Sequence, residues 1–204
     1  MMNTFNIEHF FAAIDQQRRS ENLSWPALAT AIWDQSSVLN AQRHDHPISA
    51  ATIGKLADGK SLSCQHTLFV LRWLGVPAET FVTAPQPGTA GVPLPAADAA
   101  HRLRWNLAKL YASLNAARTA RDATWQQTAD RLGCSPSQLT GLRTAKFGTG
   151  IETAMRITQA LRRPAADFVY AAEWRRRLPP LSPGTEIPAA TARLSGRPPS
   201  SVLR

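Results

Sequence analysis

Several features are scarce or missing in this 204-residue sequence, and each absence argues against a class of protein. No stretch approaches eighteen consecutive apolar residues, so a membrane-spanning helix is not expected. The first residues, MMNTFNIEHFF, lack a basic segment followed by an apolar run, which argues against a secretory signal. Only two cysteines are present, Cys64 and Cys134, too few for a disulfide framework or a four-cysteine zinc site. Together these absences predict a cytoplasmic protein.

Patterns that would indicate catalysis are also missing. No Ser/His/Asp or Cys/His arrangement stands in a recognisable catalytic setting, and no cofactor is expected. His44, Asp45 and His46 are residue types that bind metals, but two histidines one residue apart in a polar loop are more often solvated. We therefore expect neither an enzyme nor a metal site.

Negative charge is scarce in one half of the chain only. The chain carries 23 Lys/Arg against 14 Asp/Glu, a net charge of +9. Residues 1–82 contain 6 Lys/Arg and 7 Asp/Glu, a net −1, whereas residues 98–178 contain 14 and 6, a net +8. Such an asymmetry predicts that the second half has a polyanionic partner.

Two segments rich in Pro, Gly and Ala divide the chain. Residues 83–97 (TAPQPGTAGVPLPAA) have four prolines, no charge and no helical periodicity, which predicts a linker between domains. Residues 179–204 have a similar composition and are expected to be a disordered tail. The remaining parts, 1–82 and 98–178, are the predicted domains.

These two predicted domains resemble each other in sequence. With a shift of 100 residues, and later of 86 and then 87, similar residues align: Phe11 with Tyr111, Trp25 with Trp125, Ser49 with Ser135, Ile53 with Leu139, Leu56 with Leu142, Lys60 with Lys146, Pro77 with Pro164 and Phe81 with Phe168. The change in shift places an insertion, about residues 33–47, in the first copy alone. The sequence therefore predicts two copies of one unit of roughly seventy residues.

Each copy is predicted to be helical throughout, because its apolar residues recur at helical spacing. In the first helix of the two copies these residues are Ile7, Phe10, Phe11 and Ile14, and Leu107, Leu110, Tyr111 and Leu114. Ser24 and Thr124 are expected to cap a second helix, and Ser135 a third. Pro77 and Pro164 are expected to open a short fifth helix. No stretch alternates with period two for long enough to predict a sheet, so the expected fold class is all-α.

The centre of the second copy, residues 124–147 (TWQQTADRLGCSPSQLTGLRTAKF), predicts two short helices joined by a turn. Ala129 is small where the two helices would cross, and Gly133 suits a left-handed helix end. The residues spaced to face the core are Leu132, Leu139 and Leu142. Ser137, Gln138 and Gly141 then lie on the outward side of the second short helix.

This segment resembles the helix-turn-helix of the phage repressor and Cro type, the XRE-like family. Both copies, about 150 residues, are similar to bacterial five-helix members of that family. In the first copy the matching residues are Leu23, Trp25, Ala29, Ser49, Thr52, Ile53 and Leu56, followed by residues 74–81 (LGVPAETF). The resemblance implies two tandem five-helix domains that bind double-stranded DNA.

The resemblance also implies a role for individual residues of the second copy. The helix that starts at Ser135 would lie in the major groove, with Ser137, Gln138 and Gly141 facing base edges. Gln138 is suited to a bidentate contact with adenine. Trp125, Gln126, Arg143 and Lys146 are expected to contact the DNA backbone.

The first copy is expected to bind DNA more weakly. Its equivalent residues are Ala51, Thr52 and Lys55 on the helix, with Lys60 as the backbone contact. The insertion lies inside the turn, where it would leave the angle between the two helices to other packing, and the net charge of −1 gives this copy little attraction to DNA. We therefore expect this copy to serve contacts between subunits of a homodimer, or with a protein partner.

One internal ion pair of the family is expected to be absent. Arg18 and Arg118 occupy the arginine position of the first helix, but Ala57 and Arg143 stand where many family members carry the acidic partner.

Other features have more than one interpretation. Trp25 and Trp125 can be core residues or DNA contacts. Residues 173–177 (EWRRR) can be a solvated helix end or a phosphate contact. Residues from Gly54 to Ser61 (GKLADGKS) match a phosphate-binding loop, but no strand is expected before them.

The expected function is that of a bacterial or phage-type transcriptional regulator that binds specific DNA sequences. An antitoxin-like module that binds a protein is the alternative, and nucleotide binding at residues 54–61 is a third.

Overall fold

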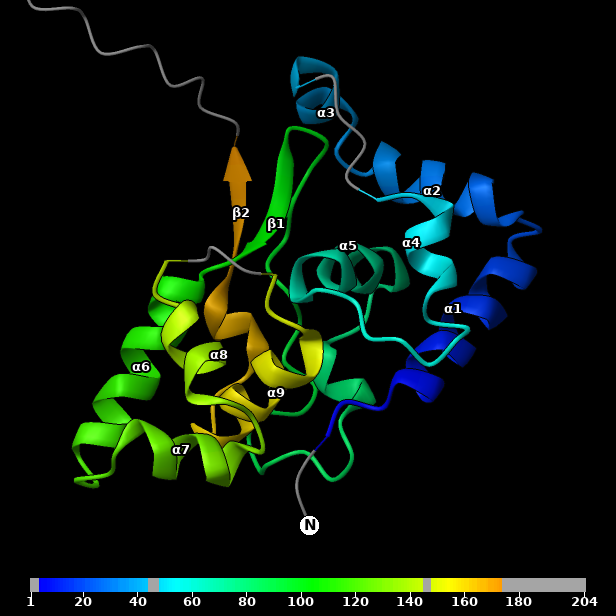
Figure 1. Ribbon diagram of the computed structural model, residues 1–204. Helices are drawn as coiled ribbons and strands as arrows, with labels where there is room; N and C mark the ends of the chain where they lie inside the picture. Colours follow the sequence, from blue (N-terminus) through cyan, green and yellow to red (C-terminus); the bar gives the residue numbers. More distant parts are fainter. Residues whose placement is uncertain (1–3, 44–47, 145–147, 174–204) are drawn as a thin grey trace, which may run out of the picture. The chain divides into compact units, whose positions relative to one another are not determined.

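The computed structural model describes residues 4–43, 48–144 and 148–173, and these residues are mostly helical. In the first half the helices are α1 (Ile7–Ser20), α2 (Trp25–Asp34), α3 (Ser37–Arg43), α4 (Ala50–Gly54), α5 (Cys64–Leu74) and the 3-10 helix η1 (Ala78–Phe81). In the second half they are α6 (Leu107–Thr119), α7 (Trp125–Leu132), α8 (Pro136–Gly141), α9 (Ile151–Ala160) and the 3-10 helix η2 (Ala165–Phe168). Figure 1 shows their arrangement. None of the helices within these ranges is long and apolar enough to cross a membrane.

The predicted helix starts are confirmed. Ser24, Thr124 and Ser135 each accept a hydrogen bond from the backbone N–H three residues further on, at the start of α2, α7 and α8. Asn6 and Asn106 cap α1 and α6 in the same way. These caps satisfy backbone groups that the helix itself cannot pair.

A small sheet corrects the all-α expectation. Strand β1 (His101–Trp105) pairs antiparallel with β2 (Val169–Glu173), and Trp105 lies opposite Val169. Each strand has only five residues, so neither shows a long alternation, and the pairing joins segments far apart in the sequence. The interpretation of residues 173–177 as a helix end is also wrong for Glu173, which ends a strand; residues 174–177 lie outside the described ranges.

The insertion in the first copy forms a helix of its own. Part of residues 33–47 folds into α3, which packs against β1. The Asn40 side chain is fully buried: its Nδ2 donates to the carbonyl of Trp33 at 2.7 Å, and its Oδ1 accepts from Arg102 Nε at 2.7 Å. The insertion therefore joins the first copy to the first strand of the second.

One arginine reinforces this junction. The Arg72 guanidinium, near the end of α5, donates to the carbonyls of Gln35, Ala97 and His101 at 2.6, 2.8 and 3.0 Å, and to the hydroxyl of Ser36 at 2.9 Å. The pKa of Arg72 is lowered because the side chain is partly buried, and the negative charge of nearby Asp98 only partly opposes this shift. A single side chain thus connects α5, the insertion and the end of the linker.

The linker, residues 83–97, contains no helix or strand but packs against the second half. The backbone N–H of Gln86 donates to Gln159 Oε1 at 2.7 Å, and the buried Thr89 donates its hydroxyl to the Gln86 carbonyl at 2.8 Å. The buried apolar residues of both halves form one cluster, and the described residues lie in one compact unit.

Candidate nucleic-acid interface

The candidate interface is built on α7, a short turn and α8. Thr124 caps α7, and Gly133 ends it in the left-handed conformation with φ of 59°. Ser135 then caps α8, with Pro136 in its first turn. Ala129 has no exposed surface where the two helices pack together, as predicted. The residues predicted to face the core are buried: Leu132, Leu139 and Leu142.

The outward side of α8 carries the residues predicted to meet base edges. Ser137 and Gln138 are exposed, and Gly141 is half-buried. These three residues line an open cavity of about 350 Å³. The rest of its lining, which the sequence did not indicate, comes from Gly148, Thr149, Gly150 and Thr153. The only sequence signal for these residues is the run of small residues before α9.

Gln138 also has a structural role at the start of α8 that was not predicted from the sequence. Its Oε1 accepts a hydrogen bond from the backbone N–H of Ser135 at 2.8 Å, and Ser135 Oγ accepts from the backbone N–H of Gln138 at 3.3 Å. This reciprocal pattern is a capping box, readable in the sequence as a serine followed three residues later by a glutamine. A bidentate contact with adenine requires both Oε1 and Nε2, so Gln138 would have to leave the cap to make it.

Trp125 is held by two side chains of α6. Tyr111 of α6 stacks on its ring with 5.4 Å between ring centroids, and the Arg118 guanidinium lies 5.0 Å from the ring centroid. The first copy repeats the arrangement with Phe11, Trp25 and Arg18. Both tryptophans therefore pack the first helix against the second.

The repeated arginines bind within their own copies. Arg118 Nη1 donates to the Ala123 carbonyl at 2.6 Å, and Arg18 Nη1 donates to the Leu23 carbonyl at the same distance. Arg18 also pairs with Asp15 at 2.6 Å, and this hydrogen bond lowers the pKa of the Asp15 carboxyl. These arginines stabilise the loop after the first helix of each copy.

The predicted backbone contacts are distributed around α7 and α8. Gln126 is exposed on the first turn of α7 and donates to Asp130 Oδ1 at 2.9 Å. Arg143 is exposed directly after α8. Lys146 lies outside the described residues.

The first copy has the same local geometry despite its insertion. Ser49 caps α4, and Ile53 and Leu56 are buried as Leu139 and Leu142 are in the second copy. Despite the insertion, α4 packs on α2 as α8 packs on α7. The described part of the insertion includes α3, which packs against β1.

The outward residues of α4 are also accessible. Ala51 and Lys55 are exposed, and Thr52 is half-buried with its hydroxyl 3.0 Å from Ser49 Oγ. Lys60 pairs with Asp58 at 3.2 Å, and both side chains are about two-thirds exposed (67% and 63%). Such a surface pair is weak, so Lys60 can exchange its partner readily.

The segment that matches a phosphate-binding loop, residues 54–61, lies in a different structural context from a true loop of that kind. Gly54 is the last residue of α4, and Gly59 lies in a turn with φ of 68°. A helix precedes the motif where a strand is required, and the sheet in the described residues is a two-stranded antiparallel one. The Ser61 hydroxyl is hydrogen-bonded to Glu152. His44, Asp45 and His46 lie outside the described residues.

Much of the positive charge in the second half has a structural role. Arg156 donates to the carbonyls of Leu132 and Gly133 at 3.3 and 2.8 Å, which secures the end of α7. Lys109 donates to the Asp167 carbonyl at 2.6 Å, and Arg102 is buried against Asn40. Carbonyl partners do not neutralise a cation, so Arg156 and Lys109 keep their contribution to the positive potential.

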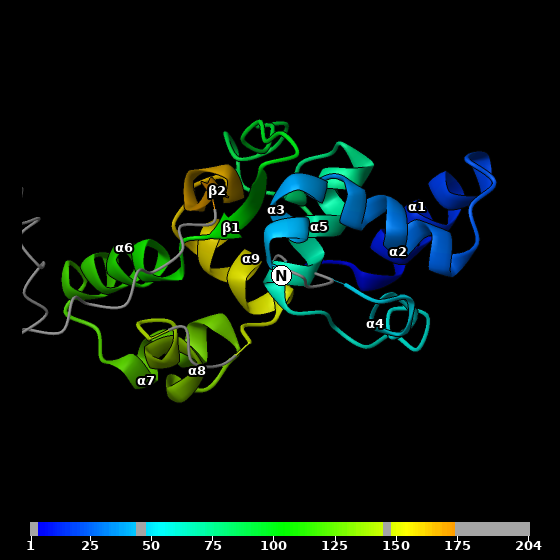
Figure 2. The ribbon, with the colours of Figure 1, turned by 90° about the horizontal axis from the view of Figure 1, so that it is seen from above.

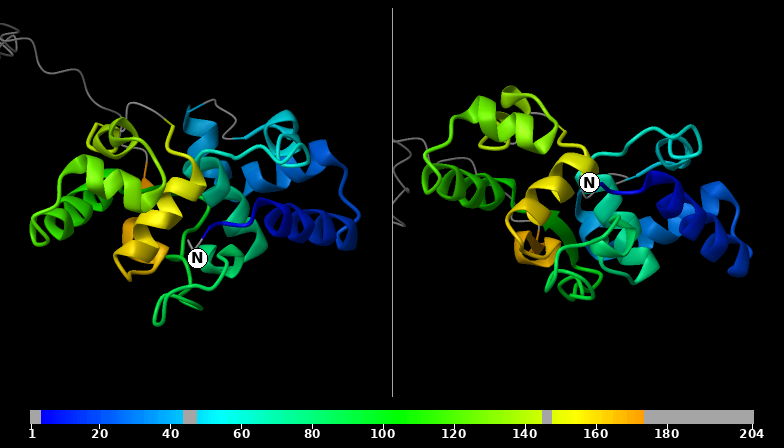
Figure 3. Two further views of the ribbon diagram at one scale, coloured as in Figure 1. Left: turned by 60° about the horizontal axis from the view of Figure 1, so that its bottom comes forward. Right: turned by 90° about the horizontal axis from the view of Figure 1, so that it is seen from below.

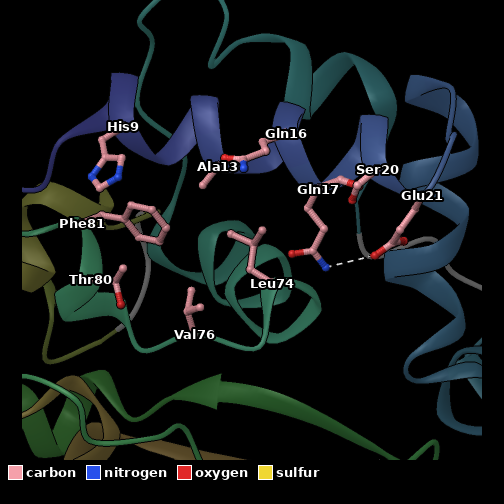
Figure 4. Close-up of a pocket in the computed structure, with 10 residues that line it drawn as sticks. All are labelled: His9, Ala13, Gln16, Gln17, Ser20, Glu21, Leu74, Val76, Thr80 and Phe81. Atoms are coloured by element: carbon pink, nitrogen blue, oxygen red, sulfur yellow. Dashed lines mark hydrogen bonds between the residues drawn. The ribbon is translucent and has the colours of Figure 1, made fainter.

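A second cavity lies in the first copy, away from the predicted DNA contacts. It has a volume of about 510 Å³ and lies between α1 and the segment that follows α5 (Figure 4). Ala13, Leu74, Val76 and Phe81 supply its apolar surface, while polar groups come from His9, Gln16, Gln17, Ser20, Thr80 and Glu21. The side chains of Gln17 and Glu21 are joined by a 3.1 Å hydrogen bond. A smaller cavity of about 100 Å³ lies among α6, α7 and α9, and Arg118, Arg121 and Arg131 line it.

Comparison with known proteins gives no relative: no family model, no curated protein and no solved structure matches this chain.

Proposed function

We propose that this protein binds specific sequences of double-stranded DNA as a transcriptional regulator. The proposal takes the two copies as tandem five-helix domains of the phage repressor type. In it α8 enters the major groove and carries the sequence specificity.

The observation that carries the proposal is the geometry of α7 and α8. Gly133 and Ser135 fix the turn between them, and the leucines of both helices are buried. The outward side of α8 is left with small or polar residues, Ser137, Gln138 and Gly141, so a groove wall can approach closely.

Charge supports the same proposal. Residues 98–178 carry a net +8, and Arg143 is exposed at the end of α8. In the proposed complex Arg143, Lys146 and Gln126 contact phosphates on either side of α8, while Trp125 acts by holding α7 in place.

Selection of bound duplexes from a random pool tests the proposal. The full chain should enrich one convergent motif, and binding should weaken as salt rises. Ser137→Glu, which adds a negative charge to the outward face of α8, should abolish enrichment. Ala90→Glu is the matched control, because Ala90 is an exposed linker residue, and it should leave enrichment unchanged. Failure of the full chain to enrich any motif would refute the proposal.

The cavity of the first copy favours a second candidate, protein binding. It is lined by both apolar and polar side chains in a domain of net charge −1, features that suit a partner side chain better than DNA. If this is the function, Leu74→Glu should abolish capture of a partner at any salt concentration, and the random-pool selection should fail.

A further inference from the structure

The two copies contact each other through equivalent residues. Cys64 donates its backbone N–H to the Thr149 carbonyl at 2.7 Å, and Ile151 donates to the Leu62 carbonyl at 3.1 Å. Under the repeat shift of 87 residues, Cys64 corresponds to Ile151, and Leu62 corresponds to Thr149. The two hydrogen bonds therefore join equivalent positions: the first copy provides the donor in one bond, and the second copy provides the equivalent donor in the other.

This reciprocity extends into the helices that follow. Ser63 and Gly150, also 87 residues apart, form an antiparallel bridge directly before α5 and α9, and these two helices contact each other. Leu68 and its equivalent Met155 are both fully buried. In a two-fold interface each contact occurs twice, the second time between the equivalent residues with the two copies exchanged. The contacts above follow this rule.

The edges of the two copies repeat as well. Asn6 donates its backbone N–H to the Phe81 carbonyl at 2.7 Å, and the equivalent Asn106 donates to the Phe168 carbonyl at 2.7 Å. The isolated bridge between Phe5 and Val82 is the counterpart of the pair Trp105–Val169 in the sheet. The chain is thus an internal dimer of two similarly folded units.

The arrangement places α4 and α8 on one side of the compact unit. Figures 2 and 3 agree that these two helices lie on the same face, with α5 and α9 between them and the linker on the opposite side. Both helices are capped by serine and packed on their preceding helix.

We propose that a single chain binds one DNA duplex through both α4 and α8, at an asymmetric site of two unequal half-sites. This inference rests on the proposed function. The internal interface takes the place that our sequence-based expectation gave to a second subunit. That expectation took α4 to be both less basic and less well formed than α8; α4 is capped by serine and packed on its preceding helix as α8 is, although the first copy carries a net charge of −1.

The two half-sites differ because the two helices present different groups. The face of α8 carries Ser137 and Gln138, whereas α4 presents Ala51 and Thr52 at the equivalent positions, followed by Lys55. An alanine offers only a methyl contact to thymine, so α4 adds affinity and selects few bases.

The test uses the full chain and the duplex enriched from the random pool. Light scattering should give one chain per duplex. Insertion of 5 bp between the half-sites rotates one half-site relative to the other by about half a helical turn, and the affinity of the protein for the duplex should fall at least tenfold. A 10 bp insertion should not restore affinity, because the α5–α9 interface fixes the distance; domains on a flexible linker would recover it.

Variants of α4 complete the test. Ala51→Glu and Lys55→Glu should each weaken binding at least fivefold, whereas Ala90→Glu should not, with circular dichroism verifying the fold of each. Two chains on a palindromic site, or full affinity in both α4 variants, would overturn the internal dimer while leaving DNA binding by α8 intact. Absence of any enriched duplex would overturn the proposed function itself.

Discussion

At the scale of single residues, Gln138 has two roles, one in capping α8 and one in the proposed contact with bases. Its carbonyl oxygen completes the cap of α8, and its amide is the side-chain group on α8 best able to distinguish bases. The proposed contact with bases can be removed without the cap, since a glutamate at this position also closes a capping box.

We predict that Gln138→Glu keeps stability but loses DNA affinity. The variant retains the acceptor for the Ser135 N–H, so its melting temperature should stay close to that of the wild type. It lacks the amide donor and adds a negative charge, so affinity for the enriched duplex should fall by about tenfold or more, or roughly 1–3 kcal/mol. Gln138→Ala should lose both properties. Unchanged affinity in Gln138→Glu would remove this residue from the interface.

Arg143 and Lys146 provide a test of backbone contacts. Each alanine variant should weaken binding to specific and unrelated duplexes by the same factor. Each should also reduce the slope of log affinity against log salt by about one, because one fewer counterion is released. Titrations between low and moderate salt measure that slope. A change in sequence preference at constant slope would instead assign the residue to a base.

At the scale of elements, local signals were predictable and long-range pairings were not. Helix starts follow from a cap and a few neighbouring residues, so Ser24, Thr124 and Ser135 were identified from the sequence. The outward face of α8 followed from helical spacing in the same way. The sheet and the packing of α3 depend on partners many residues away, and five-residue strands leave too short a pattern to recognise.

The insertion should stabilise the fold through Asn40. Asn40→Ala removes a buried acceptor of Arg102 and a donor to the Trp33 carbonyl, and should lower the free energy of unfolding by about 1–3 kcal/mol. Gln42→Ala, an exposed change in the same helix, should have little effect. Chemical denaturation of the two variants compares them directly. Equal stability of the Asn40→Ala and Gln42→Ala variants would show that Asn40 does not stabilise the contact between the two halves.

Glu79 of η1 should make stability depend on pH. Its carboxylate is buried, and its Oε1 accepts from the Ala165 N–H at 2.6 Å. Burial raises the pKa of Glu79 above its usual 4.5, although the Ala165 N–H opposes this. A raised folded-state pKa contributes stability that is full below the unfolded value and is lost as pH rises through the folded value.

The comparison with Glu79→Gln isolates this effect. Glutamine keeps an oxygen for the Ala165 N–H and does not ionise. The wild-type melting temperature should therefore fall relative to the variant as pH rises from about 4.5. Parallel pH profiles for the two proteins would show that Glu79 does not titrate differently on folding.

At the scale of the whole molecule, the proposed duplication would account for both the fold and its asymmetry. In this proposal two similar units pair through α5 and α9 and differ in the insertion, the sheet and the charge. The repeat was visible in the sequence, but the two-fold contact was not, since Leu62, Ser63 and Cys64 give no sign of their partners. In the proposed complex, the charge difference makes α8 the stronger DNA anchor and α4 the weaker one.

Photo-cross-linking from position 138 tests the central claim, that α8 lies against the bases of a DNA groove. A photoreactive amino acid would replace Gln138 in one full-length protein and the linker residue Ala90 in a control, each mixed with the enriched duplex. We predict efficient cross-links from position 138 to a few adjacent bases, and none from position 90. Equal yields from the two positions, or no cross-link from position 138, would contradict the account.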